Sequence, residues 1–257
     1  VIAIINQKGG VGKTTTAVNL SALLGAMGQR VLMIDLDPQG NTTSGLGMEV
    51  DDKSIYEVIM GRMKLTDVME ETEFKNLSIA GSDVRLANAE LELVEVEKRE
   101  YRLKTAVQSV QQDFDFIFID CPPSLGLLTI NALGAADSVL IPIQCEYYAL
   151  EGVASLMNTI SRVKKTINPH LEIEGVLLTM LDGRTNLGLQ VVDEVKKHFK
   201  KQVYATVIPR SVRLGEAPSH GEPIHVYDKR SAGCVAYVNL AKEVLKRNNI
   251  KVKEFKL

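Results

Sequence analysis

Residues 1–16, which read VIAIINQKGGVGKTTT, decide the fold of this chain. The apolar run at 1–5 predicts a buried strand, and the glycines that follow let successive backbone N–H groups curl around an anion. A helical period from residue 14 onward adds the positive end of a helix at the same place. We therefore predict a phosphate-binding loop in which Lys13 reaches the β- and γ-phosphates of a nucleotide and the Thr14 hydroxyl binds Mg²⁺.

This loop differs from the general nucleotide-binding template at its start. Gln7 stands where that template has its first glycine, and a second lysine, Lys8, opens the loop instead. The Gly-Lys-Thr sequence at the other end is intact. With a strand before it and a helix after it, the loop is poorly explained as a simple surface turn.

The rest of the chain alternates strand and helix patterns. Short runs rich in Val and Ile predict buried parallel strands at residues 31–34, 116–119, 139–143, 176–178 and 203–208. Helical periods cover residues 14–27, 83–111, 187–199 and 231–247, with short pieces near 55–60 and 65–69. This order predicts a single α/β domain over residues 1–257, with a mostly parallel twisted sheet and helices on both faces. Residues 248–257 form a basic tail that we expect to fray.

The composition is that of an ordinary soluble globular protein. Of the 257 residues, 45% are hydrophobic and 24% are charged, which excludes collagen-like and disordered chains. No uninterrupted apolar run reaches the roughly 18–20 residues of a membrane span, and no charged-then-apolar leader precedes the first strand. Cys121, Cys145 and Cys234 make no C-x-x-C pair, which favours reduced thiols and a cytoplasmic protein.

The net charge of −2 conceals an asymmetry between the two parts of the chain. Residues 1–160 carry 12 Lys or Arg against 22 Asp or Glu, a net −10, whereas residues 161–257 carry 18 against 10, a net +8. Such a split suggests that the second part meets a polyanion or an acidic partner. Solvated helix faces that happen to be basic explain the charge alone equally well.

Two acidic sites follow predicted strands, at the sheet edge where open α/β proteins bind their ligands. The first is DLDPQGN at residues 35–41, and the second is Asp120, which is followed by CPP. We expect Asp120 to hold Mg²⁺ through a water molecule and Asp37 to take part in phosphoryl chemistry. Asp35 could instead be structural, as a cap or turn residue.

The loop with its second lysine resembles the deviant Walker A motif of P-loop ATPases. The resemblance narrows to the ParA/Soj family of chromosome- and plasmid-partitioning ATPases, and it is carried by NQKGGVGKTTTAVNL, DLDPQGNTTSGLG, DCPPSLGLLTINAL, QCEYYALEG, LLTMLDGRTNLGLQV and VIPRSVRLGEAPSHGEPI. It implies that ATP and Mg²⁺ bring two subunits together as a homodimer. That dimer would bind double-stranded DNA without sequence preference, and a ParB/Spo0J-like partner would stimulate ATP hydrolysis. The implied protein is cytoplasmic and nucleoid-associated, with no stable membrane association.

The resemblance also implies roles for individual residues. Catalysis would use Lys8, which reaches across the dimer to the partner's nucleotide, Lys13, and Asp37, which positions the attacking water. The metal would be served by Thr14 and, through water, Asp120. The nucleotide would be bordered by Lys8, Gly9, Gly10, Val11, Gly12, Lys13, Thr14, Thr15, Pro209 and Ser211, the last of which stands where many relatives have Asn. DNA would be contacted by Arg184 and Arg213, both in the basic part of the chain.

Three other classes of protein remain as alternatives. A MinD-like positioning ATPase would attach to membranes through a C-terminal amphipathic helix, but the tail IKVKEFKL at 250–257 starts with a period of two and is short for such a helix. An iron–sulfur ATPase related to the nitrogenase iron protein would need two cysteines near the dimer axis, whereas Cys121 and Cys145 resemble packed residues. A metabolic kinase or amidoligase is disfavoured by EYYALEG and PRSVRLGEAPSHG.

Overall fold

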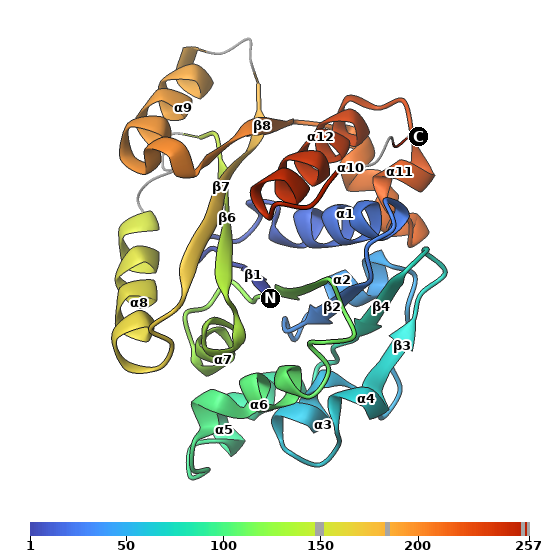
Figure 1. Ribbon diagram of the computed structural model, residues 1–257, viewed down its shortest axis with the longest axis vertical. Helices are drawn as coiled ribbons and strands as arrows, with labels where there is room; N and C mark the ends of the chain where they lie inside the picture. Colours follow the sequence, from blue (N-terminus) through green and yellow to red (C-terminus); the bar gives the residue numbers. More distant parts are fainter. Residues whose placement is uncertain (147–151, 183–185, 253–254, 256–257) are drawn as a thin grey trace.

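A computed structural model describes residues 1–146, 152–182, 186–252 and 255 of the chain. Its centre is a sheet of eight strands in the order β3-β4-β2-β5-β1-β6-β7-β8, and every neighbouring pair is parallel except β3 with β4 (Figure 1). The strands are β1 (Ile2–Ile4), β2 (Val31–Asp35), β3 (Met69–Glu71), β4 (Leu77–Ala80), β5 (Phe116–Asp120), β6 (Ser138–Gln144), β7 (Glu172–Leu181) and β8 (Val203–Pro209). The predicted mostly parallel sheet is confirmed, and β3 and β4 extend it beyond the predicted strands.

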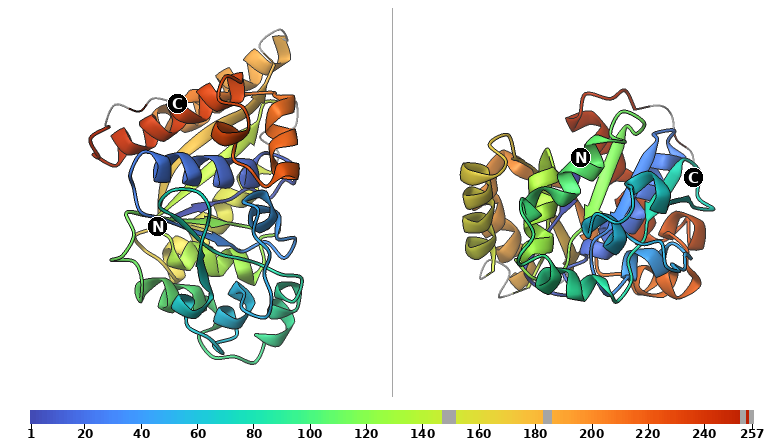
Figure 2. Two further views of the ribbon diagram at one scale, coloured as in Figure 1. Left: turned by 90° about the vertical axis from the view of Figure 1, so that its right-hand side faces the viewer. Right: turned by 90° about the horizontal axis from the view of Figure 1, so that it is seen from below.

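The helices cover both faces of this sheet. They are α1 (Lys13–Ala26), α2 (Asn41–Gly45), α3 (Ile55–Ile59), α4 (Leu65–Val68), α5 (Leu86–Glu92), α6 (Arg102–Gln108), α7 (Leu127–Ala135), α8 (Val153–Thr166), α9 (Asn186–Phe199), α10 (Val212–Glu216), α11 (Ile224–Tyr227) and α12 (Ala232–Arg247), with 3₁₀ turns η1 (Arg99–Tyr101), η2 (Lys200–Gln202) and η3 (Ala217–His220). Helices α1 and α12 lie together on one side of the strands, and α7 and α8 lie on the other (Figures 1 and 2).

The central strand shows why the fold needs two helical layers. Ile2 and Ile4 of β1 belong to a buried core shared with α1 and α12, whereas Ala3 and Ile5 belong to a second core shared with α3 and with α5 to α9. Successive side chains of a strand point to opposite faces of a sheet. A strand that is apolar at every position therefore requires cover on both faces, as the sequence predicted.

The predicted helix over residues 83–111 is wrong in its continuity, because the structure has α5, a turn, η1 and α6 in its place. The buried carboxamide of Asn131, on α7, explains the break. Its Nδ2 donates to the carbonyl oxygen of Arg99 at 2.9 Å, and its Oδ1 accepts from the backbone N–H of Leu103 at 3.1 Å. In a continuous helix these two backbone groups would bond to each other. A tertiary contact therefore overrides the local helical period.

The short helical pieces predicted before β3 are confirmed. Helices α3 and α4 occupy the places predicted near 55–60 and 65–69, and α3 packs against both α4 and α6 at the lower end of the molecule in Figure 1. Within the described ranges of the chain, no helix is both long enough and apolar enough to cross a membrane.

Candidate functional site

The loop between β1 and α1 has the geometry of an anion cradle. Gly10 and Gly12 hold φ angles of 72° and 90°, which other residues rarely adopt, so glycine is needed for the tight path of the loop. Gly12 caps α1 and has no side chain that could accept hydrogen bonds from the N–H groups of the first turn. The positive end of the α1 dipole therefore faces the loop. The Thr179 hydroxyl donates to the carbonyl oxygen of Val11 at 2.8 Å and ties the loop to β7. The predicted strand, loop and helix are thus arranged to receive a phosphate.

Lys13 is buried inside this cradle, with 7% of its surface exposed. Its Nζ donates to the carbonyl oxygen of Lys8 at 3.3 Å. Burial lowers the pKa of Lys13, whereas the negative charge of Asp120 acts in the opposite direction. A buried ammonium is stabilised most by a fixed anion, and a nucleotide phosphate would supply one.

Asp120, at the end of β5, meets two threonine hydroxyls. Its Oδ2 accepts hydrogen bonds from Thr14 Oγ1 at 2.8 Å and from Thr42 Oγ1 at 2.7 Å. The carboxyl is buried, and this burial raises its pKa to about 6. The structure thus brings together Thr14 and Asp120, the two predicted metal-site residues. Thr42 was not predicted from the sequence, although it directly follows the DLDPQGN stretch at residues 35–41 that contains Asp37.

These oxygen atoms fit a hydrated Mg²⁺. Within the described part of the chain, no group of three or more His, Cys, Asp or Glu residues could hold a metal ion by itself. Mg²⁺ keeps several water molecules and binds through one or two protein oxygens together with substrate phosphates, so it needs no such group. The Oδ1 atom of Asp120 is buried and has no hydrogen-bond partner among the described residues. It can therefore accept a hydrogen bond from a metal-bound water, while Thr14 supplies a hydroxyl ligand.

Asp35 organises the neighbouring acidic loop. Its Oδ2 accepts from the backbone N–H of Thr43 at 2.9 Å and from the Thr43 hydroxyl at 2.7 Å, and its Oδ1 accepts from the backbone N–H of Asp37 at 3.2 Å. Burial, with a smaller contribution from the charge of Asp120, raises the pKa of Asp35 to about 7. These contacts match the structural alternative for Asp35. Asp37 is also buried, and its Oδ1 accepts from the backbone N–H of Gln39 at 3.0 Å.

Lys8 contacts a carboxylate of its own chain. Its Nζ lies 3.9 Å from Oε2 of Glu146, and Oε1 of the same glutamate pairs with Nη2 of Arg210 at 3.1 Å. The Lys8 side chain is 40% exposed, so its ammonium stands at the surface beside the cradle. Glu146 was not singled out from the sequence, because only the fold places the end of β6 next to the loop. The reach of Lys8 into a second subunit stays a prediction.

A pocket of about 240 Å³ opens beside the phosphate cradle. Its lining combines Gly12 and Thr15 from the loop region with Pro209 and Ser211, which follow one another closely at the end of β8, and Tyr237 of α12 closes it. The two residues that the resemblance assigned to the edge of the nucleotide therefore share one pocket with the phosphate loop. Its position suits the base and sugar of a nucleotide whose phosphates lie in the cradle.

Of the two arginines predicted to contact DNA, only Arg213 is among the residues that the structure describes. Arg184 lies outside the described residues. Arg213 is 55% exposed on α10, where its Nη1 pairs with Glu216 at 2.9 Å and its Nε with Asp228 at 3.5 Å. Hydrogen bonding to Glu216 raises the pKa of Arg213, which keeps the guanidinium charged. The DNA contact of both arginines stays a prediction.

The cysteines have the chemistry of packed thiols. Cys121, Cys145 and Cys234 are all buried and unpaired. Burial raises the pKa of Cys145 and of Cys234 to about 11, and it also raises the pKa of Cys121. Because iron binds the thiolate form, these environments disfavour cluster ligation. They weaken the iron–sulfur alternative.

Comparison with known proteins gives consistent matches along the chain. Residues 1–173 match a protein-family model described as an AAA domain. Over 246 residues the chain is 59% identical to the sporulation initiation inhibitor protein Soj of Bacillus subtilis, covering 95% of this chain and 97% of that protein. Over 253 residues it is 51% identical to the chromosome partitioning protein ParA of Myxococcus xanthus, covering 98% and 89%.

A solved structure agrees with the fold described above. It is cobyrinic acid a,c-diamide synthase from Mycobacterium smegmatis with bound ADP and magnesium, which is 38% identical, covers 96% of this chain and 94% of its own, and superposes with a TM-score of 0.85. Its name belongs to the amidoligase class considered above. The partitioning proteins share the higher identity over almost the same length.

Proposed function

The chain belongs to the ParA/Soj family of chromosome-partitioning ATPases, and from this membership we propose that it works as an ATP-dependent dimerisation switch. In this proposal it binds ATP with Mg²⁺, dimerises, binds DNA and hydrolyses ATP to ADP and phosphate. The observation that carries the proposal is the meeting of Lys13, Thr14 and Asp120 at the carboxyl ends of β1 and β5. A cation, a hydroxyl and a carboxylate at one anion cradle are the parts that phosphoryl transfer requires.

Each part of the nucleotide has residues suited to it. The phosphates would lie against the backbone of Gly9, Gly10, Val11 and Gly12 and against Lys13, with the base in the pocket of Pro209 and Ser211. Mg²⁺, held by Thr14 and through water by Asp120, would neutralise the phosphate charge that grows during transfer. The ADP and magnesium in the Mycobacterium structure support this choice of cofactors.

Hydrolysis requires a positioned water, and we assign that task to Asp37. Asp35 holds the backbone of this loop through the N–H groups of Asp37 and Thr43, so the loop is fixed from within the protein. Lys8 would complete the partner's site when two subunits face each other. The position of its ammonium at the surface, with only Glu146 at 3.9 Å as an ion-pair partner among the described residues, supports that assignment.

DNA binding would use the basic part of the chain. The net +8 of residues 161–257 suits phosphate contacts, which carry no sequence information. Arg213 is more than half exposed, and its five N–H donors let it contact a phosphate while it keeps its bond to Glu216. Arg184 would join it in the dimer. DNA binding of this kind would place the protein on the nucleoid.

The MinD-like alternative has less support than the partitioning function. The Bacillus and Myxococcus partitioning proteins share 59% and 51% identity with almost the whole chain. We therefore propose the partitioning function, without stable membrane association.

The function can be tested by measuring ATP hydrolysis with duplex DNA alone, with the N-terminal segment of a ParB-like partner alone, with both, and with neither. A partitioning switch should be stimulated far more by both together than by the sum of the two separate effects. Stimulation that is merely additive, or a rate indifferent to both, would contradict the proposal. ATP-dependent dimerisation, followed by light scattering in the same conditions, distinguishes a failed partner interaction from a failed switch.

A further inference from the structure

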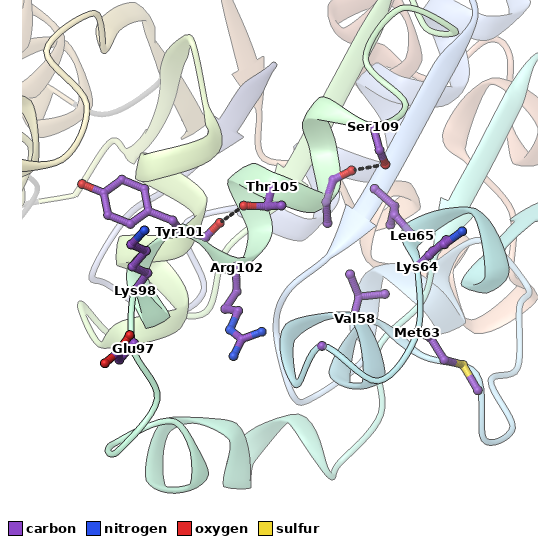
Figure 3. Close-up of a pocket in the computed structure, with 12 residues that line it drawn as sticks. Val58, Met63, Lys64, Leu65, Glu97, Lys98, Tyr101, Arg102, Thr105 and Ser109 are labelled. Carbon is purple, nitrogen blue, oxygen red and sulfur yellow. Dashed lines mark hydrogen bonds between the residues drawn. The ribbon is translucent and has the colours of Figure 1, made fainter.

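A second cavity lies away from the nucleotide site, at the lower end of the molecule in Figure 1. It is a groove of about 530 Å³ between α6 and the loop that joins α3 to α4, and none of its lining residues belongs to the phosphate loop or the base pocket. Figure 3 shows the Arg102 side chain extending into it, with Glu97 and Lys98 on one side and Val58 and Met63 on the other. Its volume is in the range of ligand-binding clefts.

The floor and the rim of this groove differ in chemistry. Val58 and Leu65 are buried apolar residues of the floor. Lys64 and Lys98 bring positive charges to the exposed rim, and Arg102 adds a third that extends into the groove. Among the residues that the structure describes, none of these three cations forms an ion pair, while nearby Arg62 and Arg85 both pair with Glu57. Only one carboxylate, that of Glu97, lines the groove. The groove is therefore an apolar surface bordered by an excess of positive charge.

Arg102 carries an unsatisfied polar atom. Its Nε is buried with no hydrogen-bond partner in the described parts of the chain. A Cβ atom at Gly61 would lie 2.6 Å from Nη1 of Arg102, so glycine at that position, with φ of 75°, allows the guanidinium to lie against the loop. A buried N–H group without a partner is unfavourable, and a bound acceptor would satisfy it.

The break between α5 and α6 gives the groove its cationic wall. Asn131 holds the carbonyl of Arg99 and the N–H of Leu103, so the chain turns there instead of continuing as one helix. Lys98, immediately before η1, adopts φ of 53°, a conformation that is uncommon for a residue with a side chain. Such conformations persist where the surrounding structure imposes them, and they are frequent at ligand sites.

We propose that this groove binds an acidic peptide segment of a partner protein, in which one or two large apolar side chains are flanked by Asp or Glu. The apolar floor would take the apolar side chains, and Lys64, Lys98 and Arg102 would pair with the flanking carboxylates. Nucleic acid suits the groove less well, because an apolar floor contributes nothing to phosphate binding and residues 1–160 carry a net charge of −10. A short peptide meets chiefly the local cations, since more distant charges are screened within about 10 Å.

The test uses the full chain and a panel of fluorescein-labelled peptides of about 12 residues, each with two leucines at a different spacing between glutamates. Each has a counterpart with lysine in place of glutamate. Fluorescence anisotropy should show saturable binding of at least one acidic peptide in the micromolar range, weakened by salt, and no binding of its lysine counterpart. Lys98→Glu and Lys64→Glu, both at exposed positions, should each weaken this binding roughly tenfold.

Lys75→Glu is the matched control, because Lys75 is an exposed lysine between β3 and β4 that does not line the groove. It makes the same charge change and should leave peptide binding as it is in the parent. Circular dichroism establishes that all three variants are folded. The proposal is overturned if no acidic peptide binds or if Lys75→Glu weakens peptide binding as much as Lys98→Glu does. If, in the absence of peptide binding, Lys98→Glu weakens the binding of duplex DNA or inorganic phosphate, the groove is a phosphate site and the proposal is likewise overturned.

Discussion

Replacing Asp120 by asparagine tests the electrostatics of the proposed metal site. Asp120 has 1% of its surface exposed, and burial raises its pKa from 3.8 to about 6. A carboxyl whose pKa is higher in the folded state binds more protons there than in the unfolded state, so stability is lost as pH rises from about 4 to about 6. About two pKa units, at roughly 1.4 kcal/mol each, correspond to about 3 kcal/mol. The Asp120→Asn variant should escape this loss.

The assay is urea denaturation in EDTA without nucleotide, at about pH 4 and about pH 8. The stability of Asp120→Asn relative to the parent should improve by roughly 2–3 kcal/mol from the lower pH to the higher, because costs that do not depend on pH, such as a buried amide N–H, cancel in this comparison. The same variant should lose Mg²⁺-dependent ATP turnover.

Asp115→Asn is the control. Hydrogen bonding to Arg30 lowers the pKa of Asp115 from 3.8, so its ionisation stabilises the fold chiefly as pH rises to about 4. The stability of this variant relative to the parent should therefore change little between about pH 4 and about pH 8. If the relative stability of Asp120→Asn is the same at both pH values, burial does not set the ionisation of Asp120, and our account of the metal site is wrong.

Three further predictions concern the switch. Asp37→Ala should still bind ATP but release phosphate at least roughly a hundredfold more slowly, because the variant cannot position water, and a parental rate would refute this role. Lys8→Ala should bind nucleotide through Lys13 yet remain monomeric with ATP in light scattering, whereas a normal ATP-dependent dimer would exclude the cross-subunit role. Arg213→Ala should weaken anisotropy-measured binding to two unrelated duplexes alike and lower the salt dependence by about one phosphate contact, while Arg30→Ala, at an exposed arginine outside the basic part, should change neither.

The central strands and the phosphate loop could be predicted from the sequence alone. Residues 1–16 carry strand, loop and helix signals without a gap, and the positive φ angles of Gly10 and Gly12 are local requirements that only glycine meets easily. Thr14 and Asp120 could be paired from the sequence because each has a fixed place, at a helix start or a strand end, on the same edge of a parallel sheet. Features that depend only on residues close together in the sequence can be predicted without knowing the fold.

Features that depend on contacts between distant segments emerged only in the folded chain. Asn131 breaks the helix predicted over 83–111, and its effect is invisible locally because its partners, Arg99 and Leu103, are about 30 positions away. Thr42 lies beside Asp120 only in the folded chain, where the segment after β2 meets the end of β5. The cationic groove likewise joins Lys64 to residues of α6 that lie far along the chain. Hydrogen bonds and charge interactions depend on the distance between groups in space, not on their separation in the sequence. Sequence periodicity indicates only which face of an element is buried.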